Sequence, residues 1–393
     1  MILKAYKFRL KTSPGQAAQC AHIASVCRLV WNLCLGQRVM VYNSRRQSIN
    51  AYKQLLEVTQ LRREYDWIKA VPAQALQQAI RDLDAAYANF FAGRAAFPEF
   101  KKKGRSRVAF RFPQGIKVDG RRIFLPKIGW VGFFKSQEIA GEIRHATVSR
   151  TGRHWFVSLT CTVEIEEPVR QSGEVGIDMG IVKLCALSDG TIHENPDCLK
   201  RHQARLAMLQ RRLAHKTKFS KNFYKAKAKI TALHTKIADT RRDFIHKTTT
   251  TIAKSHGLVV IEDLRVKAMS GSARGTVESP GRRVRQKAGL NRGILDAGWG
   301  EFRRQLEYKL AWSGGILVAV DPRNTSRACP VCGHIAPDNR PTQAEFRCVA
   351  CGHEDDADIN AAINILRAGH ARLACGENGA PRPLCEAGTL KAA

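Results

Sequence analysis

Two pairs of cysteines in the last quarter of this 393-residue chain carry its plainest chemical signal. Each pair has the spacing Cys-x-x-Cys and is followed directly by glycine; the four residues are Cys329, Cys332, Cys348 and Cys351. Four thiolates make the ligand set of a structural zinc ion, which is tetrahedral and keeps no open position. The spacing therefore predicts one structural Zn²⁺, with disulfides or unpaired core thiols as the alternatives.

Three acidic residues stand at the ends of apolar segments, far apart along the chain. Asp178 lies in Gly-Ile-Asp-Met-Gly, Glu262 ends the run Leu-Val-Val-Ile-Glu, and Asp358 opens an apolar helical pattern just after the last cysteine. A carboxylate is expensive to bury unless it is paired, hydrogen-bonded or bound to metal. Taken singly, each residue could be an ordinary turn or solvated acid.

If the three carboxylates converge, they repel one another and shift their pKa values unless cations lie between them. Two Mg²⁺ ions, or Mn²⁺, suit such oxygen ligands and the cleavage of a phosphodiester bond. One ion activates the attacking water and the other stabilises the leaving oxygen. The acids therefore predict a metal-dependent nuclease, with purely structural carboxylates as the alternative.

The charge balance points to a polyanionic partner. The chain has 65 Lys and Arg against 34 Asp and Glu, a formal net charge of +31. Such an excess repels itself in a compact protein unless a polyanion neutralises it, and nucleic acid is the commonest one. A membrane surface is the competing partner, but no apolar run is long enough to span a bilayer. We therefore expect a protein that binds nucleic acid and does not bind a membrane.

Cysteine usage and the N-terminus indicate the cellular compartment. Of the twelve cysteines, those outside the two pairs are scattered, and some fall in apolar helical patterns. Scattered buried thiols are typical of a reducing compartment. The first ten residues lack the apolar core of a signal peptide and alternate like a strand. The expected location is the cytoplasm.

The first 170 residues predict a sheet interrupted by helices. An alternating strand over residues 2–11 is followed by a capping box at Ser13-Pro14-Gly15-Gln16 and helical patterning to about residue 60. A second amphipathic helix starts near Pro72. Short strands are then predicted over residues 108–112, 123–126, 143–149 and 155–163. Together they predict a small β-barrel or open sheet that the N-terminal strand completes.

Two basic segments are candidates for nucleic-acid contact. The first is a glycine-punctuated loop after Phe97, and the second is a helical hairpin over residues 199–254. A charge run is usually only a solvated face, but basic residues interleaved with aromatic ones favour nucleic acid. The candidate contacts are Lys101, Lys102, Lys103, Arg105, Arg107, Arg211, Arg212, Arg241 and Arg242.

The second half alternates strands and helices. An apolar hairpin turns at Gly180, buried strands are predicted over residues 257–262 and 315–320, and the helical hairpin breaks at residues 215–223. This alternation is compatible with an α/β core of the RNase H type. The Gly, Ser and Arg-rich residues 266–292 predict a mobile basic lid.

These motifs together resemble the TnpB family, transposon-encoded RNA-guided DNA endonucleases similar to type V CRISPR effectors. The matching residues run along the whole chain, from the Tyr-Lys-Phe-Arg-Leu opening through Phe97-Pro-Glu-Phe-Lys to Gly176-Ile-Asp-Met-Gly180. The most specific are Thr325-Ser-Arg-Ala-Cys-Pro-Val-Cys-Gly333 and Asp356-Ala-Asp-Ile-Asn-Ala-Ala-Ile-Asn-Ile365. The resemblance implies that Asp178, Glu262 and Asp358 are the acids of a RuvC-type nuclease.

The resemblance also implies a domain plan. A wedge-like β-barrel would comprise residues 1–12 and 96–170, with a helical recognition domain over residues 13–95. The RuvC-like core would comprise residues 171–328 and 354–368, with the zinc ribbon over residues 329–353 inserted into it. The Gly, Pro and Ala-rich residues 369–393 predict a disordered tail.

The partners implied are a guide RNA from the transposon end and double-stranded target DNA beside a short motif, with no protein partner required. Two alternatives stay open: a transposase that joins DNA strands with the same acids, and a catalytically silent RNA-guided repressor. Asp356 is the fallback for the third acid. Asp358 is preferred because it stands two residues before Asn360, as in the family pattern.

Overall fold

The computed structural model describes residues 1–164 and 171–375. The chain divides into two compact units, the first within Met1–Ile165 and the second within Glu166–Glu386, and each is described by itself. In the described ranges no helix combines the length and apolar character needed to cross a membrane.

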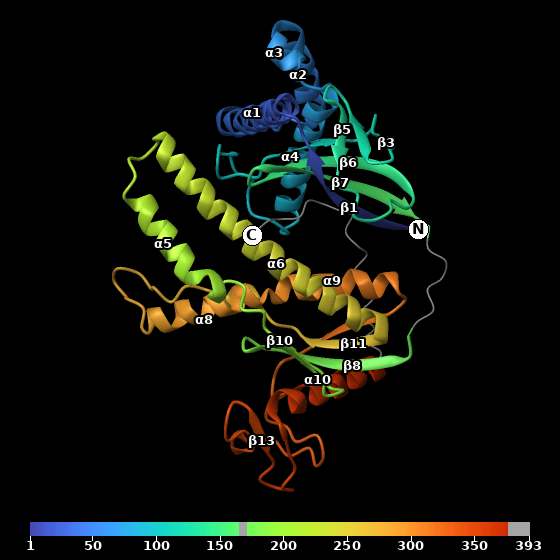
Figure 1. Ribbon diagram of the computed structural model, residues 1–393, viewed down its shortest axis with the longest axis vertical. Helices are drawn as coiled ribbons and strands as arrows, with labels where there is room; N and C mark the ends of the chain where they lie inside the picture. The colour runs from blue at the N-terminus through green and yellow to red at the C-terminus, as the bar shows by residue number, and fades with distance from the viewer. Residues whose placement is uncertain (165–170, 376–393) are drawn as a thin grey trace. The chain divides into compact units, whose positions relative to one another are not determined.

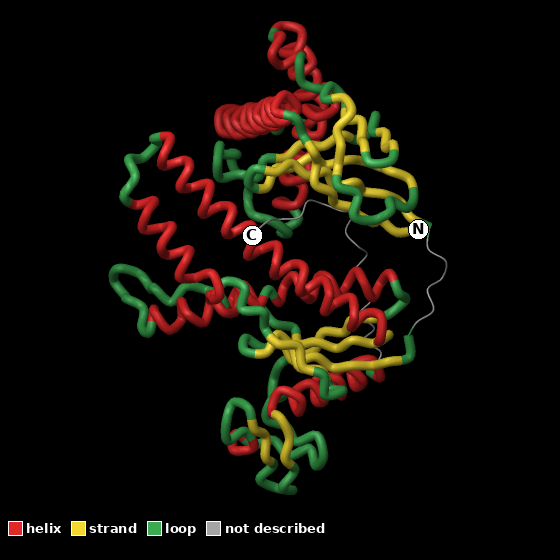
Figure 2. Tube along the Cα trace, viewed as in Figure 1, coloured by secondary structure: helices red, strands yellow, loops and turns green. Residues whose placement is uncertain are grey.

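The first unit is built on a seven-stranded antiparallel sheet (Figures 1 and 2). Its strands are β1 (Ile2–Lys11), β2 (Ala109–Phe112), β3 (Lys117–Asp119), β4 (Arg122–Leu125), β5 (Gly129–Phe133), β6 (Glu142–Thr151) and β7 (His154–Val163). The order is β2-β6-β7-β1-β5-β4-β3, so β1 completes the sheet as expected. The edge strands β2 and β3 are not paired with each other within the described residues, so hydrogen bonding leaves the sheet open rather than closed into a barrel.

Alternation along β1 decides which face of the sheet is buried. Tyr6, Phe8 and Leu10 are buried, while the basic residues between them are exposed. β6 and β7 form the expected hairpin, and Gly152 in its turn has a φ of 58°, a conformation that glycine adopts without strain.

The helices between β1 and β2 are α1 (Pro14–Arg45), α2 (Ala51–Glu64), α3 (Asp66–Lys69) and α4 (Ala73–Phe91). The capping box at Ser13 and Gln16 is confirmed. The expectation of continuous helix to about residue 60 is wrong, because Arg46 takes a left-handed φ of 53° and Asn50 caps a new helix. Buried side chains of α1 and α4 share one core with the sheet, so the helical insertion and the strands fold as one unit.

The second unit contains a five-stranded mixed sheet. Its strands are β8 (Gly173–Met179), β9 (Lys183–Leu187), β10 (Ile192–Glu194), β11 (His256–Glu262) and β12 (Ile316–Val320). The order is β10-β9-β8-β11-β12, with β8, β9 and β10 antiparallel and β8, β11 and β12 parallel. β11 is buried from Gly257 to Glu262, as expected for a central parallel strand covered on both faces.

Helices cover both faces of this sheet (Figure 1). The helices of this unit are α5 (Gln203–Ala214), α6 (Lys221–Ser255), α7 (Val266–Met269), α8 (Val284–Ala297), α9 (Trp299–Trp312) and α10 (Ala357–Ala374), with short 3₁₀ turns at Lys200–His202 and Pro337–Asn339. α6 and α9 bury Ile245, Phe302 and Leu306 against one face, and α10 buries Ile365 against the other.

α10 approaches β8 closely because the strand has no side chain at the point of contact. A Cβ atom at Gly176 would lie 2.1 Å from the carbonyl oxygen of Ala362. The hairpin β13 (Glu345–Arg347) and β14 (Glu354–Asp356) leads directly into α10. This connection places the start of α10 immediately after the cysteine-containing segment.

Two expectations need correction. Residues 284–292, expected to belong to a mobile lid, form the first part of α8. Residues 369–374, expected at the start of a disordered tail, form the last turns of α10, where Gly369 lies against Val260. The expected wedge residues 165–170 and the rest of the expected tail, residues 376–393, lie outside the described residues.

Candidate metal centres

The three acidic residues lie at one edge of the mixed sheet. Asp178 is on β8, Glu262 ends β11, and Asp358 is in the first turn of α10. β8 and β11 are parallel neighbours, and Ile177 pairs with Ile261, so Asp178 and Glu262 come next to each other in register. Parallel strands present their carboxyl ends at the same edge, which explains why residues 84 positions apart meet.

Strand periodicity also puts both acids on the face that α10 covers. Gly176 and Val260 face α10, and Asp178 and Glu262 follow two residues later on the same side. Asp358 enters from the start of that helix. The structure therefore brings the three predicted acids to one place.

The pKa of Asp178 reflects this proximity. Its pKa is raised from 3.8 to about 7, first by burial and then by the charges of Glu262 and Asp358. Burial also raises the pKa of Glu262, whose side chain is 9% exposed and accepts a 2.7 Å hydrogen bond from the hydroxyl of Thr325. The two strand acids thus resist ionising together, as carboxylates do without a cation between them.

Asp356 has a different environment from Asp358. Its Oδ1 accepts hydrogen bonds from the backbone amides of Asp358 and Ile359, which caps α10, and its Oδ2 lies 2.8 Å from Lys183 Nζ. Burial acts to raise its pKa, but the hydrogen bonds from Lys183 and the two amides outweigh it and hold the pKa below its usual value. Both oxygens of Asp356 are therefore engaged, and Asp358 is the residue whose charge acts on Asp178.

Two cations lie against the third acid. Lys183 Nζ is 3.3 Å from Asp358 Oδ2, and Arg340 Nη2 is 3.5 Å from Asp358 Oδ1. Arg340 belongs to the cysteine-containing segment, so that segment contacts the acidic centre through one side chain. These cations supply part of the positive charge that balances the carboxylates.

The four cysteines are gathered more tightly than the acids. Their Sγ atoms all lie within 4.8 Å of one another, a density that the acidic residues do not reach anywhere in residues 1–164 and 171–375. Cys329 Sγ is 3.6 Å from Cys351 Sγ, and Cys332 Sγ is 3.5 Å from Cys348 Sγ. Four sulfurs bound to zinc at about 2.3 Å would stand about 3.8 Å apart, so the cluster fits a tetrahedral zinc ion.

The backbone around the cysteines repeats itself. The amide of Cys329 donates to His334 O at 2.9 Å, and that of Cys348 donates to His353 O at 2.8 Å. Gly333 and Gly352 occupy matching left-handed positions with φ of 76° and 73°. Two equivalent turns therefore present two thiols each.

One buried amide, that of Asn339, joins the two turns. It donates to the carbonyl oxygens of Arg327 and His334 at 2.9 and 3.1 Å and accepts from the amide of Val349 at 3.0 Å. Its side chain is fully buried, so these bonds replace the water that it loses on folding.

The predicted nucleic-acid contacts divide into free and engaged residues. Six of them are exposed and form no ion pair within the described ranges. They are Lys102, Lys103, Arg105, Arg107, Arg211 and Arg212. Lys101 instead stacks its Nζ 3.5 Å over the ring of Trp31, and burial lowers its pKa.

The two arginines of α6 also have protein partners. Arg241 Nη1 lies 3.0 Å from Asp296 Oδ1, an aspartate that is almost fully buried. Arg242 Nη1 lies 3.1 Å from Asp239 Oδ1 on the surface of the same helix. Arg241 therefore anchors α6 to α8, and its guanidinium is not free for a phosphate.

Sequence reasoning missed Lys183, Arg340, Thr325 and Asn339. The sequence weakly indicated that Lys183 lies near Asp178, because Lys183 begins the strand that returns antiparallel to β8. Thr325 begins the motif Thr325–Gly333, but the motif did not assign it a role beside an acid, and no sequence signal pointed to Arg340.

Three family profiles match the chain. Residues 156–273 match OrfB_IS605, described as "Probable transposase", and residues 299–365 match the "Cas12f1-like, TNB domain". Residues 1–47 match a "Helix-turn-helix domain", although this range forms one strand and one long helix, α1, in the structure.

Two curated proteins are similar over nearly their whole length. One, of Escherichia coli K12, is 47% identical over 95% of this chain and 94% of its own length; the other, of Streptomyces pristinaespiralis, is 34% identical over 97% and 93%. Both are named "Putative RNA-guided DNA endonuclease", the former with the addition InsQ.

A solved structure, the cryo-EM complex of Cas12f1 with sgRNA and target DNA, has a similar fold. The TM-score is 0.57 at 15% identity, covering 93% of this chain and 98% of that chain. The likeness shows a similar fold and says nothing by itself about activity.

Proposed function

Because the chain belongs to the TnpB family of transposon-encoded RNA-guided DNA endonucleases, shown by a relative that is 47% identical over 95% of the chain, we propose that it shares this activity. It would be a Mg²⁺-dependent endonuclease that cleaves double-stranded DNA next to a short flanking motif, at a site chosen by a guide RNA.

The strand order of the second unit supports the proposal that this unit is a nuclease core of the RNase H type, as in RuvC. Numbered within this unit, its strand order is 3-2-1-4-5, with a three-stranded antiparallel meander followed by two parallel strands. A carboxylate stands on the first and on the fourth of these strands, next to each other. The segment over residues 329–353 would be a zinc ribbon inserted before the last helix.

The observation that carries the proposal is the convergence of three acids, which raises the pKa of one of them. Asp178, Glu262 and Asp358 come from two strands and a helix, and the pKa of Asp178 is raised to about 7 by burial and by the other two. Divalent cations bound there would favour the ionised forms of Asp178 and Glu262 near neutral pH.

The residues present fit Mg²⁺, a hard ion that prefers carboxylate oxygens. When bound there, such ions would lower the pKa of an attacking water and stabilise the leaving oxygen of the phosphodiester. Asp178, Glu262 and Asp358 would hold the ions. Thr325 fixes the orientation of Glu262 by its hydrogen bond, and Asp356 fixes the start of α10 and hence Asp358.

The zinc site would be structural, since four thiolates fill a tetrahedral zinc ion and leave no place for substrate. The guide RNA and the DNA strand paired with it would be held by backbone contacts while base pairing reads the sequence. Exposed Lys102, Lys103, Arg105 and Arg107 are candidates for those contacts. A cytoplasmic location follows from these partners and from buried cysteines left as free thiols.

The test begins with protein purified from cells that express it with its transposon end. Sequencing of the co-purifying RNA identifies the guide, and a plasmid with the matching target is then incubated with the complex and Mg²⁺. We expect double-strand cleavage by the wild type and by Asp243→Ala, an exposed acid on α6. We expect none by Asp178→Ala, although RNA still co-purifies.

Equal cleavage by Asp178→Ala would refute the assignment of the acidic centre. The profile description "Probable transposase" favours strand joining as the second candidate, and joined rather than cut DNA ends would support it. Target binding by the wild type without any cleavage would instead support a guided repressor.

A further inference from the structure

The start of α10, which carries the third acid, packs directly on the cysteine centre. Four side chains, each at most 2% exposed, form one buried cluster there: Cys329, Phe346, Cys348 and Ala357. Ala357 is the first residue of α10 and stands between Asp356 and Asp358. Its amide donates to Ala344 O at 2.9 Å, which ties the helix start to the cysteine-containing segment. The position of Asp358 therefore depends on the packing around two of the four cysteines.

A second connection runs from the first cysteine to Glu262. The residues just before Cys329, numbers 325–328, form a turn that we call the entry loop. The hydroxyl of Thr325, at the start of this loop, donates to Glu262 Oε1 at 2.7 Å. Both side chains are less than 10% exposed, so little water is available to replace this hydrogen bond. The entry loop therefore joins a strand acid to the cysteine centre.

One side chain of α10 fixes both ends of the entry loop. The amide group of Asn364 donates to the carbonyl oxygen of Thr325 at 2.9 Å and to that of Ala328 at 2.7 Å. A side-chain amide has two hydrogens to donate, so both are used here. Asn360, one turn earlier on α10, adds a bond to Ala328 O at 3.2 Å. The loop cannot move relative to the helix without breaking these bonds.

The cysteine turns hold the entry loop from the other side. Asn339 donates to Arg327 O, in the middle of the loop, and accepts from the amide of Val349, in the turn of the second cysteine pair. The loop thus lies between the cysteine turns and α10 and is bonded to both. A disturbance of the cysteine turns would reach Glu262 through the loop and Asp358 through the start of α10.

We propose that Asn364 is a positioning residue through which the acidic centre depends on the metal state of the four cysteines. With zinc bound, the entry loop and the start of α10 would hold Glu262 and Asp358 in place for Mg²⁺; without zinc, both acids would lose this support. The inference rests on the proposed function, because it names a residue that positions the acids of the same centre. Groups that orient metal ligands typically change metal affinity about 10- to 100-fold.

The test titrates the full-length protein with Mn²⁺, because unbound Mn²⁺ can be counted by electron paramagnetic resonance. Asp178→Asn, which should abolish tight binding, assigns the signal to the acidic centre. In Asn364→Ala we expect the affinity for Mn²⁺ to fall about 10- to 100-fold while the zinc content stays at one ion per chain. Removing zinc from the wild type with a chelator, which is then dialysed away, should lower the affinity to a similar extent.

The matched control is Asn291→Ala. Asn291, on α8, also uses its amide group to bridge two loop carbonyl oxygens, those of Ser270 and Gly271, at 3.0 and 2.9 Å. We expect this variant to bind Mn²⁺ within about twofold of the wild type, because the loop that it bridges holds none of the three acids. An equal loss of affinity in both variants, or no loss in Asn364→Ala, would overturn the inference.

Hydrogen exchange measures the support of the acids without any Mn²⁺. The amides of Asp358 and Ile359 donate to Asp356 in the first turn of α10, so their exchange reports the order of this turn. We expect exchange in residues 354–366 to rise about tenfold on zinc removal and in Asn364→Ala, because the turn opens more often. Unchanged exchange in both cases would contradict the proposed coupling.

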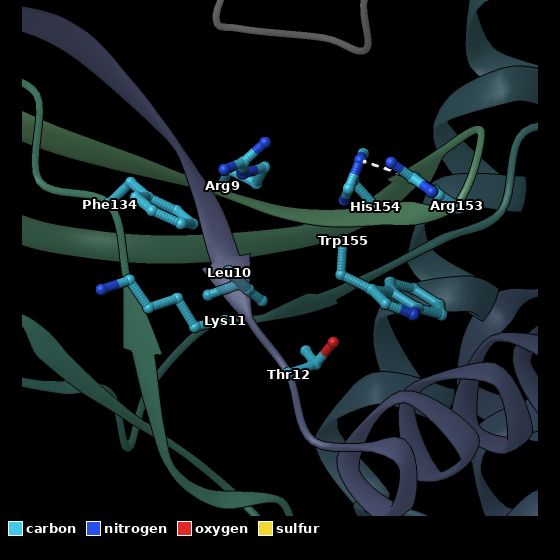
Figure 3. Close-up of a pocket in the computed structure, with 8 residues that line it drawn as sticks. All are labelled: Arg9, Leu10, Lys11, Thr12, Phe134, Arg153, His154 and Trp155. Atoms are coloured by element: carbon cyan, nitrogen blue, oxygen red, sulfur yellow. Dashed lines mark hydrogen bonds between the residues drawn. The ribbon is translucent and has the colours of Figure 1, made fainter. Parts of the chain in front are cut away.

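β7 is the internal reference for unfolding of the whole chain. It belongs to the first unit, where its residues His154 and Trp155 line the pocket shown in Figure 3. Exchange in β7 should not change when zinc is removed. If it rises as well, zinc removal unfolds the chain, and Asn364→Ala, which keeps its zinc, decides the outcome.

Cleavage of matched plasmid by the wild type is measured in parallel. If the wild type fails to cleave while zinc removal and Asn364→Ala both raise exchange in α10, the nuclease proposal fails and the coupling stands. If the wild type cleaves and neither change affects α10 or the affinity for Mn²⁺, only the coupling fails.

Discussion

The two candidate metal centres of the second unit differ in how far the protein alone assembles them. The four cysteines are already gathered within 4.8 Å, on two equivalent turns joined by Asn339. The three acids share one edge of the sheet but stand further apart, and two cations lie against Asp358.

The difference follows from ligand chemistry. A thiol ordinarily ionises at a higher pH than a carboxylate, so thiols repel one another less near neutral pH and backbone turns can hold four of them together. Carboxylates are charged near neutral pH and repel one another, which the raised pKa of Asp178 records. The fold thus assembles the cysteine centre completely, while the acidic centre keeps a repulsion that bound cations would relieve.

The largest effect is expected from breaking the preassembled centre. Cys348→Ser removes one of four zinc ligands, and structural zinc sites contribute about 10–16 kcal/mol of apparent binding free energy. We expect bound zinc, measured by plasma mass spectrometry, to fall from one ion per chain to none. Limited proteolysis should then cut within residues 329–353. Cys375→Ser, at an exposed cysteine outside the cluster, should keep its zinc; an equal fall there would contradict the four-cysteine assignment.

The next effect separates the two aspartates at the start of α10. Asp358→Asn should lower the rate of DNA cleavage about 1000-fold, because a ligand to a catalytic ion contributes several kcal/mol to transition-state stabilisation. Asp356→Asn should lower it only about 10- to 100-fold, since asparagine still caps the helix and the residue acts through position. Plasmid cleavage rates measure both, and the reverse order would make Asp356 the third acid.

A pH experiment tests the repulsion in the acidic centre. The pKa of Asp178 is about 7 in the folded protein against 3.8 as its ordinary value, so its contribution to stability is present below pH 4 and is lost as pH rises through 7. Without divalent ions, Asp178→Asn should therefore stabilise the protein at pH 8 by on the order of 4 kcal/mol and have little effect at pH 4.

Thermal unfolding at both pH values, with and without Mg²⁺, measures this effect. Mg²⁺ should remove most of the difference by stabilising the wild type. A variant that is destabilised at pH 8 would show that the carboxylate is held by favourable partners, and the contrast between the two centres would not stand.

The smallest effect concerns the cation beside the acids. Lys183→Met removes the ammonium next to Asp356 and Asp358, and partly exposed ion pairs are worth about 0.2–1 kcal/mol. We expect the Mg²⁺ concentration for half-maximal cleavage to fall about two- to fivefold. Lys200→Met, which removes a lysine paired with Asp197 elsewhere in the unit, should leave the Mg²⁺ requirement unchanged. A higher requirement in Lys183→Met would mean that Lys183 helps to assemble the site.

The residues that form both candidate centres could be picked out from the sequence because their signals are local. Two Cys-x-x-Cys pairs and a carboxylate closing an uninterrupted apolar strand can be recognised without knowledge of the fold. Parallel pairing of β8 with β11 then follows from the fold class and brings Asp178 and Glu262 together.

The partners of those residues could not be predicted in the same way. Lys183 and Asp356 are 173 residues apart, and nothing in either segment specifies that their charges meet. For the same reason Arg241 was assigned to nucleic acid, although Asp296, on another helix, binds it. Charge is visible in a sequence, whereas the partner that neutralises it depends on long-range packing.

The close approach of Gly176 to Ala362 limits which sequences can carry this fold. A methyl group at position 176 would meet the carbonyl oxygen of Ala362 at 2.1 Å and push α10 away from β8. Asp358 would move with its helix, although position 176 has no reactive group. Natural variation at this glycine should therefore be as restricted as at the acids, and a directed-evolution library should lose activity from Gly176→Ala before any ligand is touched.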